Sequence, residues 1–152
     1  MNKFVFSQRS KNNLSGVNPL LVKIAYRALD ISTADFAVIE GVRTLKKQKE
    51  NVKKGVSKTL DSRHLTGDAI DILPSAIKPG MEWQPHFFEP VLMAFKQAAD
   101  EEGVTLRFGK NWKSDPSLPV ETRFPDYPHI DHDEKERTTY YCGGCDGLAT
   151  DI

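Results

Sequence analysis

The chain has 152 residues, which is enough for one domain with a hydrophobic core and too few for two. Its 21 basic and 21 acidic residues give a formal net charge of zero, so the broad basic surface typical of nucleic-acid-binding proteins is not expected. No segment has the apolar core of a signal peptide or approaches the about 18 apolar residues that span a bilayer. We therefore expect a monomer that is made in the cytoplasm, binds no nucleic acid and does not insert stably into a membrane.

The first part of the chain predicts two helices and a strand. Residues 8–15 are polar and rich in turn-forming residues, so we expect a loop there. Asn18 followed by Pro19 is typical of a helix start, and apolar residues then recur at helical spacing to about residue 30. Residues 34–40 contain enough apolar side chains for a strand. Residues 45–54 are rich in lysine and predict a solvated helix.

The second part predicts one long helix between short strands. Residues 68–73 alternate as a strand does, and residues 104–108 predict another short strand. Between them, apolar residues follow helical spacing over 85–102, and Gly103 is a suitable helix end. The sequence therefore predicts a small α+β domain in which two main helices pack on a mostly antiparallel sheet, with a metal site in a cleft.

A candidate metal site begins in segment 62–72, which has the sequence SRHLTGDAIDI. A continuous helix would hold His64 and Asp71 about 10 Å apart, and a continuous strand would hold them more than about 20 Å apart. Zinc needs its ligand atoms within about 4 Å of each other, so the chain must bend between the two residues, and Gly67 permits a bend. On spacing alone, a loop-capping His64 and an exposed strand residue Asp71 remain the simpler alternative.

Segment 124–132, with the sequence FPDYPHIDH, is the candidate second half of this site. His129 would be the third ligand, and three ligands of the types His, Asp and His leave a fourth position for water, as in catalytic zinc sites. Asp126 is then free to act as a general base. If a strand continues here, His129 and Asp131 share one face and His132 points away, so His132 is not expected to be a ligand.

These motifs resemble a known enzyme family. The pattern Ser-x-His-x-x-Gly-x-Ala-x-Asp, followed by an acidic residue three positions before a histidine, resembles the zinc D,D-carboxypeptidase-like peptidases of the VanX and VanY type. Within that group the chain is most similar to bacteriophage L-alanyl-D-glutamate peptidases, because four motifs occur in the same order: Glu40–Thr44, Ser62–Asp71, Leu106–Trp112 and Asp126–His129. The resemblance covers residues 1–132, so we expect a zinc peptidase domain there and a tail of unknown role at 133–152.

The resemblance implies a zinc-dependent endolysin that cuts the peptidoglycan stem peptide, above all at the L-Ala–D-Glu bond, during host lysis. It also implies that Arg43 stabilises the developing oxyanion and that Ser62 hydrogen-bonds the substrate, beside the ligands and base named above. A planar guanidinium suits the role given to Arg43. Endolysins of this kind wait in the host cytoplasm until a separate membrane protein opens the way to the wall.

Other functions remain open. D-Ala-D-Ala carboxypeptidases and dipeptidases of the same family usually carry Glu at the position of Asp126, which favours the endopeptidase. A catalytically silent wall-binding module or a virion structural domain would not need the candidate base or the arginine. A nuclease built on residues 129–132 would leave segment 62–71 and the neutral charge unexplained. Cys142 and Cys145 form a lone C-x-x-C, for which incidental reduced thiols are a better explanation than a disulfide or an adventitious metal clip, and redox catalysis is a poorer one still.

Overall fold

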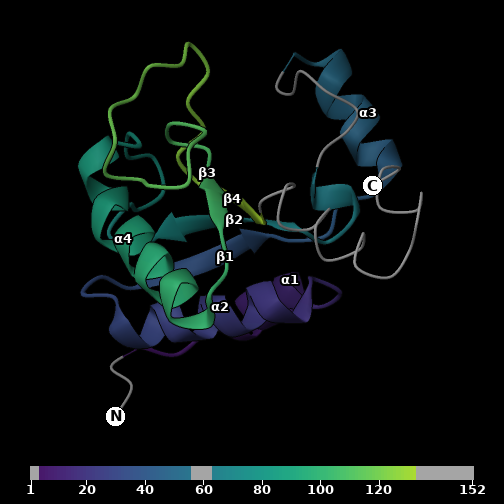
Figure 1. Cartoon of the computed structure of the whole chain (residues 1–152). Coiled ribbons are helices and arrows are strands. Elements are labelled where there is room, and N and C mark those ends of the chain that lie inside the picture. The colour runs from purple at the N-terminus through teal and green to yellow at the C-terminus, as the bar shows by residue number, and fades with distance from the viewer. Residues whose placement is uncertain (1–3, 56–62, 133–152) are drawn as a thin grey trace, which may run out of the picture.

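The computed structural model describes residues 4–55 and 63–132. They form a small α+β domain whose strands all pair antiparallel, which confirms the predicted fold class (Figure 1). The elements, in chain order, are α1 (Gln8–Leu14), α2 (Pro19–Ile31), β1 (Phe36–Glu40), α3 (Leu45–Lys53), the 3-10 helix η1 (Arg63–Leu65), β2 (Ala69–Pro74), α4 (Pro85–Glu102), β3 (Leu106–Phe108) and β4 (His129–His132).

The strand order β1-β2-β4-β3 places β4 inside the sheet, between β2 and β3. Asp71 of β2 pairs with His129 of β4, and Asp131 of β4 pairs with Arg107 of β3. Residues that pair directly across antiparallel strands project from the same face, and residues two apart on one strand do so too. One face of the sheet therefore carries a row of polar side chains from β2, β4 and β3.

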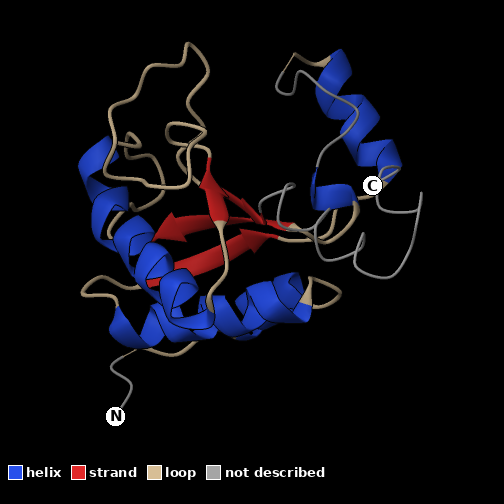
Figure 2. Ribbon diagram, in the orientation of Figure 1, coloured by secondary structure: helices blue, strands red, loops and turns tan. Residues whose placement is uncertain are grey.

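The opposite face of the sheet carries the hydrophobic core. Ile70, Ile72 and Ile130 are fully buried there, and α2 and α4 pack against each other and against this face (Figure 2). The two helices begin and end where the sequence predicts. Asn18 caps α2 by accepting a hydrogen bond from the backbone N–H of Leu20 at 3.0 Å, and α4 ends at Gly103.

The loop expected at residues 8–15 is wrong, because this segment forms α1. The Ser7 side chain caps the helix at the backbone N–H of Ser10. The Ser10 hydroxyl accepts a hydrogen bond from the backbone N–H of Val38 at 3.0 Å, and the Asn13 amide donates to the Val38 carbonyl at 2.8 Å. Polar side chains of α1 thus satisfy the outer edge of β1, an edge strand that would otherwise expose unpaired backbone groups.

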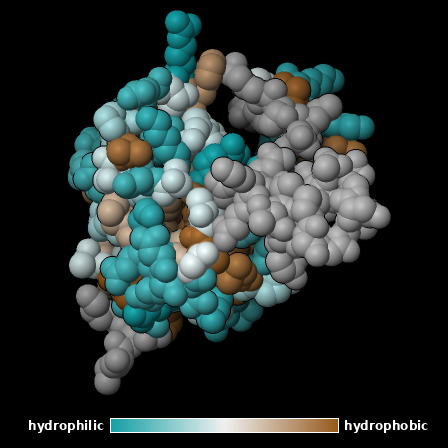
Figure 3. Space-filling model, viewed as in Figure 1, coloured by the Kyte–Doolittle hydropathy of each residue, from teal (hydrophilic) through white to brown (hydrophobic). Residues whose placement is uncertain are grey.

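The predicted lysine-rich helix is confirmed as α3, which stands apart from the packed helices (Figure 1). Its buried residue is Gln48, a polar one. In the part of the chain that the structure describes, no helix is long and apolar enough to cross a membrane. On the face shown in Figure 3, exposed hydrophobic side chains form separate patches among hydrophilic ones, a distribution that is ordinary for a globular surface.

Candidate metal centre

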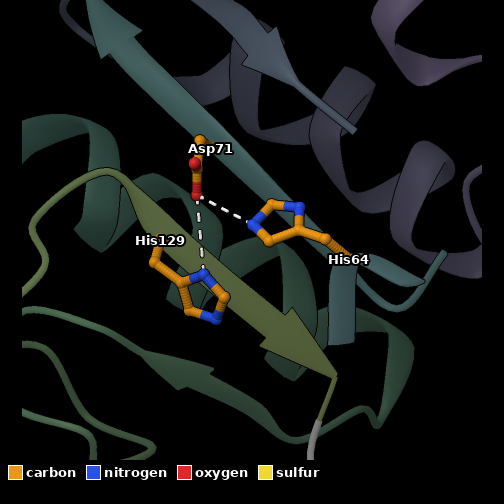
Figure 4. Close-up of side chains that lie close together, drawn as sticks. All are labelled: His64, Asp71 and His129. Carbon is orange, nitrogen blue, oxygen red and sulfur yellow. Dashed lines mark hydrogen bonds and ion pairs between the residues drawn. The ribbon is translucent and has the colours of Figure 1, made fainter. Parts of the chain in front are cut away.

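Three side chains from separate elements converge on the polar face of the sheet (Figure 4). Asp71 Oδ1 lies 3.2 Å from His64 Nε2 and 3.5 Å from His129 Nδ1. One ligand-type atom from each residue lies within 4.8 Å of the other two. Two imidazole nitrogens and one carboxylate oxygen form a donor set that suits zinc, and other first-row transition metals also accept it. The structure thus brings together the three residues that the sequence analysis selected from two separate motifs.

The bend between His64 and Asp71 lies at Gly67, as the spacing requires. Gly67 has a φ of 79°, and a Cβ there would lie 2.8 Å from the carbonyl oxygen of Gly16. A residue with a side chain would therefore meet both an unfavourable backbone conformation and a clash. The bend is tied to α2, because the backbone N–H of Asn18 donates to the Gly67 carbonyl at 2.8 Å.

A backbone carbonyl orients the ring of His64. Its Nδ1 lies 2.8 Å from the carbonyl oxygen of Gly41, directly after β1. Because a carbonyl only accepts hydrogen bonds, Nδ1 must carry the proton. Nε2 is then the nitrogen that faces Asp71, 3.2 Å from its Oδ1, and it is the atom that a metal would bind.

The carboxylate of Asp131 orients the ring of His129. The ring Nε2 lies 2.8 Å from Asp131 Oδ2, which leaves Nδ1 facing Asp71. Burial alone would lower the pKa of His129, but hydrogen bonding to Asp131 and Asp71 raises it to about 9. Burial alone would raise the pKa of Asp71, but hydrogen bonds from the two histidines hold it well below its usual range. Without a metal, the cluster is therefore a carboxylate beside a protonated imidazole.

Arg43 lies at the edge of this cluster. Its Nη2 is 4.0 Å from Asp71 Oδ2, and its backbone N–H donates to the His64 carbonyl at 2.9 Å. The guanidinium also donates to the side chains of Glu40 and Gln48, while its Nε is buried without a partner among the described residues. Arg43 thus brings positive charge to the site, although two of its donor groups are already engaged.

Asp126 lies beside the cluster on the segment that leads into β4. Its backbone N–H donates to the Gly109 carbonyl at 2.7 Å, and its own carbonyl accepts from the backbone N–H of His129 at 3.1 Å. The residue is exposed, yet the surrounding protein partly desolvates its carboxylate. This desolvation and the negative charge of Asp71 raise the pKa of Asp126 above its ordinary value. A carboxylate with a raised pKa is a stronger base, as general base catalysis requires.

His132, which the sequence analysis did not expect to be a ligand, lies away from the cluster. His132 projects to the face opposite His129 and is not part of the convergent group. It is buried, and within residues 4–55 and 63–132 neither of its ring nitrogens has a hydrogen-bond partner. Ser62, Cys142 and Cys145 lie outside the described residues, as does the tail at 133–152.

Sequence reasoning missed three groups that surround the cluster: the carbonyl of Gly41, the side chain of Gln48 and the side chain of Arg107. Gln48 sits in a lysine-rich helix whose composition indicates only a solvated face. Arg107 gave no motif signal, and its role follows from the pairing of β3 with β4. A backbone carbonyl leaves no trace in a sequence. For Asp131, the period of two along β4 does indicate that it shares a face with His129.

Comparison with known proteins shows which family the chain belongs to. Residues 2–132 match the family model for phage L-alanyl-D-glutamate peptidase. The chain is 38% identical over 141 residues to the L-alanyl-D-glutamate peptidase of Escherichia phage T5, which covers 90% of this chain and 93% of that protein. The crystal structure of the Serratia marcescens L-Ala D-Glu endopeptidase ChiX superposes with a TM-score of 0.72 at 34% identity, over 88% of this chain and 94% of that one. The chain therefore belongs to the phage L-alanyl-D-glutamate peptidase family, which confirms the resemblance seen in its motifs.

Proposed function

We propose that this protein is a zinc-dependent endopeptidase that cuts the L-Ala–D-Glu bond of the peptidoglycan stem peptide, with His64, Asp71 and His129 as the metal ligands. The observation that carries the proposal is the convergence of these three donors beside Asp126 and Arg43. Membership of the peptidase family supports the choice of bond. The orientation of both imidazoles supports the choice of ligands, since each directs one nitrogen toward Asp71.

Each residue of the site then has its own role in the proposed reaction. Bound zinc supplies an activated water and polarises the scissile carbonyl. Asp126 accepts a proton as the general base and passes it to the leaving amine, a role for which its raised pKa suits it. Arg43 contributes positive charge close to Asp71, where it stabilises the tetrahedral oxyanion. Ser62 is proposed to hydrogen-bond the substrate.

The proposal extends to the organisation of the chain. Residues 1–132 would form the peptidase domain, and the role of residues 133–152 stays open. We expect a monomer that is made in the host cytoplasm as an endolysin and reaches the peptidoglycan only after the membrane has been opened. A neutral overall charge is compatible with this life cycle, because it does not draw the protein to nucleic acid.

Mass spectrometry of fragments released from purified peptidoglycan tests the proposal directly. We expect peptides that begin with D-Glu and a glycan that retains L-Ala, and a zinc chelator should abolish this release. Release of terminal D-Ala instead would make the protein a carboxypeptidase of the same family. Intact peptidoglycan in the presence of stoichiometrically bound zinc would favour a wall-binding module and contradict the proposed activity.

Two variants separate the ligands from the base. His129→Ala should lose both zinc and activity, whereas Asp126→Ala should keep zinc and lose hydrolysis by about 10²-fold or more. His86→Ala is the matched control, because His86 is an exposed histidine at the start of α4. A His129→Ala protein with stoichiometric zinc would refute the ligand assignment, and an active Asp126→Ala protein would refute the assignment of the base.

A further inference from the structure

The buried carboxylate of Asp131 stands between a proposed metal ligand and an arginine. Asp131 is fully buried, and its Oδ2 lies 2.8 Å from His129 Nε2. A buried carboxylate is costly unless its oxygens are paired, so this position needs partners that stay in place. His129 supplies one of them through the ring nitrogen that does not face Asp71.

Arg107 supplies the other partner with a fixed geometry. Its Nε lies 3.2 Å from both oxygens of Asp131, and its Nη2 lies 2.7 Å from Oδ2. The two residues pair directly across β3 and β4, so the sheet register itself sets their approach. A planar guanidinium that contacts both oxygens prevents the carboxylate from rotating. The acceptor for His129 is thereby held at one place.

The ring of Trp112 packs beside both Arg107 and His129. The Arg107 guanidinium lies 5.1 Å from the centre of the Trp112 ring, and the same ring lies 5.2 Å from that of His129. Trp112 has a φ of 56°, and it is the only residue other than glycine with a positive φ in the described part of the chain. Its indole N–H donates to the Phe124 carbonyl at 2.8 Å. A strained backbone that is held by such contacts is typical of functional sites.

We propose that Asp131, itself held by Arg107, is a positioning residue that fixes the His129 ring with Nδ1 toward His64 and Asp71 and so sets the affinity of the site for zinc. This proposal rests on the proposed function, since it requires His129 to be a ligand. It differs from the arrangement at His64, whose ring is oriented by the Gly41 backbone. Because the acceptor for His129 is a side chain, it can be changed by mutation. Because this acceptor is anionic, it also makes the imidazole a better electron-pair donor to a metal.

Zinc affinity is the quantity that tests this role. The zinc dissociation constant of the full chain would be measured by competition with a chromophoric chelator, for the original protein and for Asp131→Asn, which is nearly isosteric but uncharged. We expect the constant to rise about 10- to 100-fold in this variant, the range usual for losing such an outer partner. The absorption bands of the cobalt-loaded protein should change as well, because they report ligand geometry and a merely stabilising ion pair would leave them unchanged.

Two further variants make the test decisive. Arg107→Gln leaves the Asp131 carboxylate in place but frees its orientation, so we expect a smaller rise in the same constant, and it carries the test if Asp131→Asn fails to fold. Glu101→Gln removes an exposed carboxylate that pairs with Arg27 at 2.7 Å, and zinc affinity should not change. If folded Asp131→Asn and Arg107→Gln bind zinc and cobalt as the original does, the positioning role is wrong. If the original protein binds no zinc, the proposed function itself fails.

Discussion

Gly109 allows the segment that carries Asp126 to approach β4 closely, and replacing it tests how far catalysis depends on that approach. A Cβ at position 109 would lie 2.2 Å from the carbonyl oxygen of Asp126 and 2.8 Å from Cβ of His129. Two short backbone hydrogen bonds hold the three residues together, from Gly109 to the His129 carbonyl at 2.8 Å and from Asp126 to the Gly109 carbonyl at 2.7 Å. The added methyl group therefore meets backbone that is already fixed.

The size of the effect follows from these distances. Ordinary contact needs at least 3.4 Å, so Gly109→Ala must move the Asp126 backbone by about 1 Å. A displacement of this size at a catalytic group costs about 10²-fold in rate, and overpacking costs about 1–3 kcal/mol in the free energy of unfolding. We expect both effects in Gly109→Ala, with the fall in kcat measured on a soluble stem-peptide substrate at saturating zinc.

Gly80→Ala provides the matched comparison. Gly80 has a φ of 86° and no heavy atom would lie within 4 Å of an added Cβ, so the substitution brings backbone strain of about 1–2 kcal/mol without a clash. Both variants should lose stability in urea unfolding, and only Gly109→Ala should lose kcat. A folded Gly109→Ala protein with unchanged kcat would refute the view that this close approach positions Asp126.

Three other predictions concern proton release, the pH dependence of stability and the start of α2. Because the pKa of His129 is raised to about 9 in the metal-free protein, zinc binding at pH 7 should release about one proton from this ring, and the release should disappear near pH 10. Calorimetric titration in buffers of different ionisation enthalpy measures it, and a buffer-independent heat at pH 7 would contradict the prediction. The same raised pKa stabilises the metal-free fold fully below about pH 6.5, and this stabilisation should be lost as the pH rises through about 9. Asn18→Ala should lower the free energy of unfolding by about 1–2 kcal/mol, because the side chain both caps α2 and donates to Asp68 Oδ1 at 3.1 Å. Asn18→Asp keeps the cap but sets a second carboxylate against Asp68, so urea unfolding should show incomplete recovery; full recovery would mean that only the cap matters.

The long helices could be predicted because their local signals agree with their packing. Apolar spacing and a proline in the first turn defined both α2 and α4, and a terminal glycine also marked the end of α4. In α1 only Ser10 and Leu14 are buried, so a hydrophobic period is almost absent. Its stability comes from hydrogen bonds to Val38, which lies 25 residues or more away along the chain. Local patterns do not report contacts of this kind.

The convergence of His64, Asp71 and His129 was predictable from the sequence, but the groups that surround them were not. His64, Asp71 and His129 stand in motifs whose residue types and spacing are restricted by coordination chemistry. The partners that orient them are set by strand register and loop path: a carbonyl at Gly41 and a guanidinium at Arg107. Neither follows from the sequence without the order of the strands. Asp131 was predictable in part. The alternation of side chains along β4 places it on the same face as His129, but the sequence does not show that it is buried.

The inner position of β4 also affects when the enzyme can become active during synthesis. β2 and β3 are synthesised before β4, which must lie between them. The growing sheet therefore lacks its inner strand until residues 129–132 have been made. Those four residues close the hydrogen-bonded ladder on both sides, and they also bring His129 to His64 and Asp71, the other two proposed ligands. Completion of the sheet and assembly of the proposed metal site are thus one event. A partly made chain would lack both, so cleavage activity cannot precede a finished sheet.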